Sequence, residues 1–112
     1  MGLGMTPVRR GDVFLVALEP TRGREIRKTR PCLVISPDDL NEALSTILVA
    51  PMTTGSKAYP FRIPCKFGGK LGHIVLDQVR AVDRGRLVRK LGPAGPPLLV
   101  AALKTLQEMF AP

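Results

Sequence analysis

Apolar residues gather in short runs that are separated by glycine, proline and charged residues. The first run, residues 12–18, follows Gly11 and ends before Pro20, a pattern typical of a buried strand. A second strand is predicted over 32–36, because Pro31 precedes it and proline is tolerated at the start of a strand. Further strands are predicted at 46–52, 61–65, 73–82 and 86–91.

Some of these strands carry interruptions that indicate where they lie in a sheet. Pro60 and Pro64 cannot donate ladder hydrogen bonds, so residues 61–65 are expected to form an edge strand. Asp77 and Gln78 interrupt the run 73–82, where a bulge or a bend is expected. Between the strands we predict an exposed loop at 21–29 and a glycine-rich turn at 66–72.

Two segments have helical patterns. Residues 37–43 predict a short helix or turn that begins with aspartate. Residues 98–110 predict an amphipathic helix, because apolar residues recur along one side of it. That stripe consists of Leu99, Leu103, Leu106 and Phe110, and we expect Phe110 to lie in the core together with Phe14. Closely spaced strands and one terminal helix predict a mainly β protein, a small and strongly bent antiparallel sheet or barrel.

The length of 112 residues is enough for one hydrophobic core. We expect a flexible tail over residues 1–8 and a single domain over 9–112. The longest apolar stretch, 98–103, is far shorter than the ~20 residues that cross a bilayer. The first residues lack the pattern of a secretion signal, so a cytoplasmic protein without a membrane partner is expected.

The chain is strongly basic, with 17 Lys and Arg against 9 Asp and Glu and a net charge of +8. The basic residues form two clusters, Arg22, Arg24, Arg27, Lys28 and Arg30, and Arg80, Arg84, Arg86, Arg89 and Lys90. Two such clusters produce a positive field that attracts polyanions, whereas one cluster alone would be interpreted as a solvated surface. Nucleic acid, an acidic protein segment and an anionic surface are therefore the expected partners.

The two cysteines, Cys32 and Cys65, are expected to be reduced thiols that pack as small apolar side chains. Together with His73 they would make three metal ligands, but none of the three lies at a close zinc-ligand spacing. Motifs of nucleotide hydrolases, serine hydrolases and zinc proteases do not occur in the sequence. No metal and no cofactor are expected.

Polar side chains at strand ends are the remaining candidates for chemistry. Arginine offers a fork of donors that matches phosphate oxygens, and hydroxyl groups add neutral donors. Alternatively, these side chains have structural roles: Arg30 forms an ion pair with Glu25, and Thr53 and Thr54 belong to a turn. The candidates are Arg30, Thr53, Thr54, Ser56, Lys57, Asp77, Gln78 and Arg80.

Seven short segments, taken in order, resemble the MazF/PemK (Kid) family of toxin endoribonucleases. They are Arg10–Val13, Glu19–Glu25, Lys28–Pro31, Val34–Ser36, Val49–Thr54, Tyr59–Phe61 and Asp77–Arg80. The resemblance implies an SH3-like, CcdB-like antiparallel barrel with a C-terminal helix, which forms a homodimer. It also implies cleavage of single-stranded RNA at short sequences without a metal, and inhibition by a cognate antitoxin.

The resemblance assigns roles to individual residues. Arg30 matches the family's active-site arginine, Thr53 its active-site threonine or serine, and Glu25 a glutamate in the loop that borders the RNA site. Asp77 lies in a segment taken as supporting structure. RNA-binding roles are expected for Arg27, Lys28, Thr54, Ser56, Lys57, Gln78 and Arg80. The sequence departs from the family at Ile26 and Leu15, which puts the RNA sequence preference in question.

The implied reaction is attack of the ribose 2′-OH on phosphorus, which gives 2′,3′-cyclic phosphate and 5′-OH ends. Arg30 suits stabilisation of the phosphoryl charge, because arginine keeps its proton at any biological pH. The general base is left open between Glu25 and His73, and the position of His73 is usually apolar in the family.

Two other functions fit a basic barrel. CcdB-like toxins use this fold to bind a topoisomerase and have no cleavage activity. A catalytically inactive barrel would instead bind RNA through its arginines without cleaving it. The motifs of Arg30 and Thr53 favour the nuclease. The antitoxin is expected to present an acidic, initially disordered segment to the basic groove.

Overall fold

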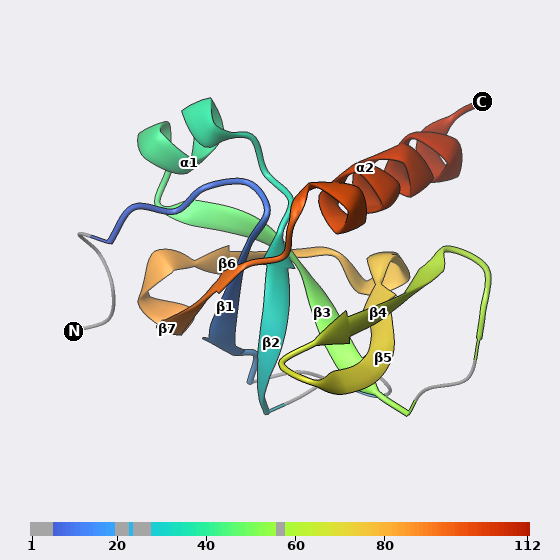
Figure 1. Cartoon of the computed structure of the whole chain (residues 1–112). Helices are drawn as coiled ribbons and strands as arrows, with labels where there is room; N and C mark the ends of the chain where they lie inside the picture. Colours follow the sequence, from blue (N-terminus) through green and yellow to red (C-terminus); the bar gives the residue numbers. More distant parts are fainter. Residues whose placement is uncertain (1–5, 20–22, 24–27, 56–57) are drawn as a thin grey trace.

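The computed structural model describes residues 6–19, 23, 28–55 and 58–112 of the chain (Figure 1). These residues form seven strands, two α-helices and two short 3-10 helices. The elements are β1 (Asp12–Ala17), β2 (Thr29–Val34), α1 (Asp38–Ala43), β3 (Thr46–Thr54), β4 (Arg62–Phe67), β5 (Lys70–Val75), η1 (Leu76–Gln78), β6 (Arg80–Asp83), η2 (Arg84–Arg86), β7 (Leu87–Pro93) and α2 (Pro96–Phe110).

All strand pairs are antiparallel, and β3 connects the two parts of the sheet. The first part of β3 pairs with β2 and β6, and its last residues pair with β5. The strand order is β4-β5-β3-β2-β1-β7, while β6 pairs with β3 from outside this path. η2 links β6, which pairs with β3, to β7, which pairs with β1, so the bent sheet forms the predicted small barrel.

The central strands are buried on both faces, which is why their sequences are nearly continuous apolar runs. Phe14 and Val16 of β1 belong to one core cluster. Val13 of β1 and Leu33 of β2 belong to a second cluster, which α2 covers with the fully buried Ala102. Figure 1 shows α2 lying across the end of the barrel and running outward to the C-terminus.

The prediction that Phe110 lies in the core is wrong, since 74% of this residue is exposed. Phe110 is the last residue of α2, at the end that extends away from the sheet (Figure 1). Leu103 and Leu106, which share its stripe, do pack against the second core cluster. Periodicity predicted the correct face of the helix but not where the underlying sheet ends.

Two strand boundaries differ from the prediction because hairpin geometry decides them. The turn expected over 66–72 shrinks to Gly68 and Gly69, whose φ angles of 59° and 78° suit a two-residue hairpin turn. Its flanking residues belong to β4 and β5. The run 73–82 is interrupted where expected, but by the short helix η1 rather than by a bulge.

Residues 6–8 pack against the barrel, whereas the sequence predicts a flexible N-terminal tail over residues 1–8. Val8 is 5% exposed and belongs to the first core cluster. The backbone carbonyl of Thr6 accepts a hydrogen bond of 2.8 Å from Arg84. Residues 1–5 lie outside the described part of the chain. No helix in the described residues is long and apolar enough to cross a membrane.

Candidate active site

A pocket of about 190 Å³ lies where the ends of β2 and β3 meet the β4–β5 hairpin. It brings together three residues that the sequence singled out, Arg30, Thr53 and Thr54. The other lining residues are Thr29, Pro31, Met52, Cys65, Phe67, Lys70 and Gly72. The described lining residues include two cations and no carboxylate, so the pocket suits an anion such as a phosphate.

Strand register brings Arg30 and Thr53 together from distant parts of the chain. Cys32 pairs with Pro51, and Arg30 and Thr53 each lie two residues further toward the same end of these neighbouring strands. Pro31 favours an extended backbone at Arg30, which pairs with Val16 of β1 on its other side. The half-buried Arg30 is therefore part of a hydrogen-bonded strand and does not belong to a loop.

The Thr53 hydroxyl is buried, and its Oγ1 has no hydrogen-bond partner among the described residues. A buried polar atom in this state costs about 1–3 kcal/mol. A hydroxyl can both donate and accept, so a bound phosphate oxygen or ribose hydroxyl would satisfy it. Within the described part of the chain, this hydroxyl therefore remains available to a bound ligand.

The β4–β5 hairpin supplies pocket residues that the sequence analysis did not single out. Phe67 and Lys70 face each other across the turn and both line the pocket. The sequence signal was present, because two glycines between alternating residues are typical of a tight hairpin. Lys70 therefore adds a second cation to the site of Arg30.

Other predicted RNA-binding residues do not line this pocket. Arg80 instead donates to the carbonyl of Leu18 at 3.4 Å. Arg86, which belongs to the same basic cluster, donates to the carbonyls of Ala17 and Glu19. Gln78 ends η1, also outside the pocket lining. Lys28 is exposed and precedes the pocket residue Thr29, and its carbonyl accepts a hydrogen bond from the amide of Leu18 at 3.0 Å. Glu25, Arg27, Ser56 and Lys57 lie outside the described residues.

The cysteines are both free, as expected. Cys32 lies in the first core cluster, where burial raises the pKa of its thiol to about 12 despite the nearby charge of Arg80. Cys65 packs against the second cluster, and burial raises its pKa as well. The described residues contain no group of three or more His, Cys, Asp or Glu that could hold a metal ion.

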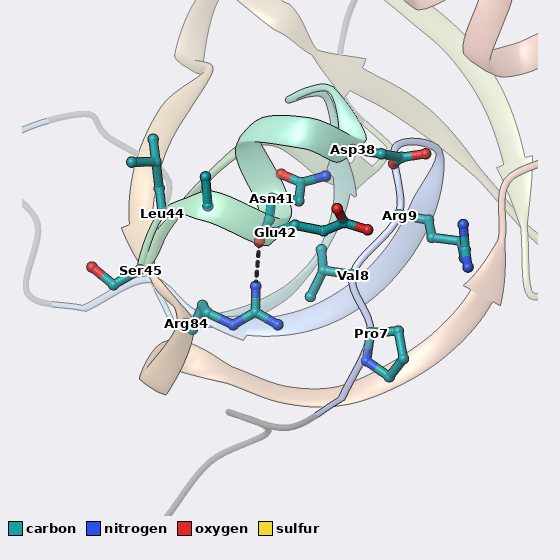
Figure 2. Close-up of a pocket in the computed structure, with 10 residues that line it drawn as sticks. Pro7, Val8, Arg9, Asp38, Asn41, Glu42, Leu44, Ser45 and Arg84 are labelled. Atoms are coloured by element: carbon teal, nitrogen blue, oxygen red, sulfur yellow. Dashed lines mark hydrogen bonds between the residues drawn. The ribbon is translucent and has the colours of Figure 1, made fainter.

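A larger pocket of about 480 Å³ lies at another part of the barrel, between α1 and residues 7–9 (Figure 2). Figure 2 shows Arg84 reaching to the carbonyl of Asn41, a hydrogen bond of 2.8 Å. Its guanidinium also donates to Thr6, so these contacts anchor the N-terminal segment. Asp38 and Glu42 line this pocket, which makes it a poorer place for a phosphate than the pocket of Arg30.

Arg62 and Asp77 form a bidentate ion pair, with both nitrogen–oxygen distances at 2.9 Å. The guanidinium also lies 4.7 Å from the centre of the Tyr59 ring. The hydrogen bonds from Arg62 lower the pKa of the Asp77 carboxyl group. The pair fixes the start of β4 to η1, consistent with the supporting role expected for Asp77.

Replacing Asp77 by asparagine should destabilise the protein by less than about 1 kcal/mol at pH 7, because the pair is partly exposed to solvent. A lowered pKa means that the pair stabilises the fold above the ordinary value near 4, and that this contribution is lost as pH falls through the lowered value. Urea unfolding of both proteins at pH 7 and pH 3 checks this. A difference that is as large at pH 3 as at pH 7 would contradict it.

The bent antiparallel sheet, its terminal helix and the arginine–threonine pocket define a small barrel protein with an anion-binding pocket. A family model for PemK-like, MazF-like toxins of type II toxin-antitoxin systems matches residues 9–110, and the chain belongs to this family. The endoribonuclease toxin MazF of Escherichia coli K12 is 36% identical over 87 residues, which cover 77% of this chain and 78% of that protein.

Solved structures support the same assignment. A crystal structure of MazF from Deinococcus radiodurans superposes with a TM-score of 0.81 at 27% identity, covering 91% of this chain and 94% of that one. A MazE–MazF structure (Form-I) from the same organism gives 0.71 at 25% identity, covering 91% and 94%. These matches confirm the predicted family, the predicted fold and the predicted class of activity, a toxin endoribonuclease.

Proposed function

We propose that this chain cleaves single-stranded RNA at short specific sequences by attack of the ribose 2′-OH on the adjacent phosphorus, without a metal. The observation that supports this most directly is the buried, unpartnered Oγ1 of Thr53 beside Arg30. A phosphodiester placed there would satisfy the hydroxyl and meet the guanidinium. Cleavage would leave 2′,3′-cyclic phosphate and 5′-OH ends.

Each proposed role follows from the chemistry of the side chain. Arg30 stabilises the charge that develops on the phosphoryl oxygens, and Thr53 holds a non-bridging oxygen or the 2′-OH. Glu25 is proposed as the general base. The contacts of Arg80 with Leu18 favour a supporting role for that residue. The remaining proposed RNA contacts are Arg27, Lys28, Thr54, Ser56, Lys57, Lys70 and Gln78.

We propose that the protein acts as a homodimer in the cytoplasm, where its RNA substrate is found. Membership of a type II toxin family and the MazE–MazF relative support a cognate antitoxin as its partner. The net charge of +8 and the cations Arg30 and Lys70 in the pocket favour an acidic antitoxin segment that orders on binding.

The test is incubation of the purified protein with a long single-stranded RNA in excess EDTA, followed by mapping of the product ends. We expect discrete cuts that end in cyclic phosphate. A folded dimer that binds RNA or a topoisomerase but makes no cuts would contradict the proposal and favour a binding module of this fold.

A further inference from the structure

The β4–β5 hairpin presents different residues on its two faces. Cys65 of β4 lies opposite Gly72 of β5, and Phe67 lies opposite Lys70. Directly opposed residues carry their side chains on the same face, and so do alternate residues along one strand. All four of these residues line the arginine–threonine pocket. Phe67 is therefore an aromatic residue on the pocket face of the hairpin.

The residues on the other face of the hairpin show the same division. Lys66 and Leu71 oppose each other there, and they line a separate hollow. Both are exposed, whereas Phe67 is half-buried and packs against the second core cluster. The core thus holds the Phe67 side chain in place while the residue still borders the pocket.

Phe67 lies within reach of a nucleotide whose phosphate is bound at the ends of β2 and β3. Thr54, Gly72 and Cys65 form a row across β3, β5 and β4, which spans about 10 Å because adjacent strands lie about 4.8 Å apart. Phe67 is the next residue of β4 on the same face, about 7 Å beyond Cys65. The pocket between these strands has a volume of about 190 Å³, which suits one base and not a run of bases.

The pocket is lined by two kinds of residue. Arg30, Lys70 and the threonine hydroxyls suit a phosphate, but the apolar residues Pro31, Met52 and Phe67 do not contribute to holding one. A nucleotide has both an anionic group and a flat apolar face. Unpaired bases are commonly bound by stacking on aromatic rings, and Phe67 is the one aromatic among the described lining residues. The lining therefore matches a nucleotide better than a phosphate alone.

We propose that Phe67 stacks on the base next to the scissile phosphate, an inference that rests on the proposed function. A base inside a duplex cannot reach this ring, so the contact makes the site require an unpaired nucleotide at the cut. Every base has a face that can stack, so Phe67 selects for an unpaired base and leaves the identity of that base to other contacts. Phe67 binds the substrate and takes no part in proton transfer.

The test measures the affinity for an RNA that spans a mapped cut and carries 2′-deoxyribose there, so that it cannot be cleaved. Phe67→Leu and Phe67→Met keep an apolar side chain against the core but lose the ring, and they should bind about 10-fold more weakly. Phe67→Tyr keeps the ring and should bind as the wild type does. The matched control is Phe110→Leu, the same change at a residue that is 74% exposed and is not among the pocket residues.

RNAs that lack one base identify the contact. When the base on one side of the cut is removed, the wild type should lose about 10-fold in affinity. On that RNA Phe67→Leu should bind as tightly as the wild type, because no base remains to stack. When a base further along the RNA is removed instead, Phe67→Leu should keep its full defect relative to the wild type.

Salt dependence separates the role of Phe67 from that of Lys70, which lies opposite it. Stacking releases no counterions, so Phe67→Leu should keep the wild-type slope of log affinity against log salt concentration. Lys70→Gln should reduce the magnitude of that slope by about 0.7, the value for one phosphate contact on a single strand.

The outcomes separate the two proposals. Three results would overturn the role of Phe67 while RNA cleavage itself stands. They are wild-type affinity of both Phe67→Leu and Phe67→Met, an equal loss of affinity in Phe67→Tyr, and a defect of Phe67→Leu that persists when either base beside the cut is removed. Failure of the wild type to cut RNA would overturn the proposed function, and the role of Phe67 with it.

Discussion

Replacing Arg30 by alanine should lower the rate of RNA cleavage by about 100- to 1000-fold, the usual effect of losing one preorganised donor to a developing negative charge. The half-buried guanidinium lies with Thr53 at the pocket where the phosphate is proposed to bind. The loss should fall mainly on the cleavage step, because Lys70 remains to attract the RNA backbone.

The measurement is single-turnover cleavage of one RNA by wild type, Arg30→Ala and Arg9→Ala. Arg9 is a matched control, since it is exposed and lines the other pocket, beside Asp38 and Glu42 (Figure 2). Both variants lose one positive charge, but only Arg30→Ala should lose activity. Its melting temperature should change little, because Arg30 belongs to neither core cluster. If Arg30→Ala cleaved RNA at the wild-type rate, this pocket would not be the active site.

Replacing Gly72 by alanine should reduce cleavage by about 100-fold and destabilise the fold by about 1–3 kcal/mol. A Cβ at Gly72 would overlap the carbonyl oxygen of Thr53 and lie 2.7 Å from its carbonyl carbon. Because the obstacle is backbone, the end of β3 must move away from β5. That movement displaces Thr53 from Arg30, and a shift of about 1 Å is enough to produce this loss of rate.

The matched control is Gly85→Ala. Neither glycine has a positive φ, and a Cβ at Gly85 would meet only the carboxylate of Asp83 at 3.2 Å, a side chain that needs to shift by only a small amount. Urea unfolding and RNA cleavage should therefore change little in Gly85→Ala and markedly in Gly72→Ala. Full activity of Gly72→Ala would show that the close contact between β5 and Thr53 does not position the site.

The fold was largely predictable because local patterns and tertiary packing agree. The run at 12–18, the short helix at 37–43 and the helix near 98–110 all occur close to their predicted positions. Element ends were less predictable. Phe110 follows the helical stripe but lies beyond the sheet, and the turn at 66–72 is shortened because the pairing of β4 with β5 continues to Phe67 and Lys70.

The candidate site was predictable only in part. Arg30 and Thr53 lie together as the family resemblance implied, and Thr54 lies beside them. Lys70 and Phe67 were missed, because they join the pocket only when the hairpin folds against β3. Arg80 resembled an RNA contact in the sequence, yet its guanidinium donates to the carbonyl of Leu18, a partner 62 residues away.

The sequence by itself determined the family and the barrel with its terminal helix, and it predicted the two residues at the centre of the candidate site. These depend on hydrophobic periodicity and on short motifs, which are properties of neighbouring residues. Only the tertiary structure decided that Thr53 Oγ1 is buried without a partner, that Gly72 must lack a side chain and that His73 lies opposite Thr53. Strand register and close backbone approach join segments far apart in the chain, so they arise only when the sheet is assembled.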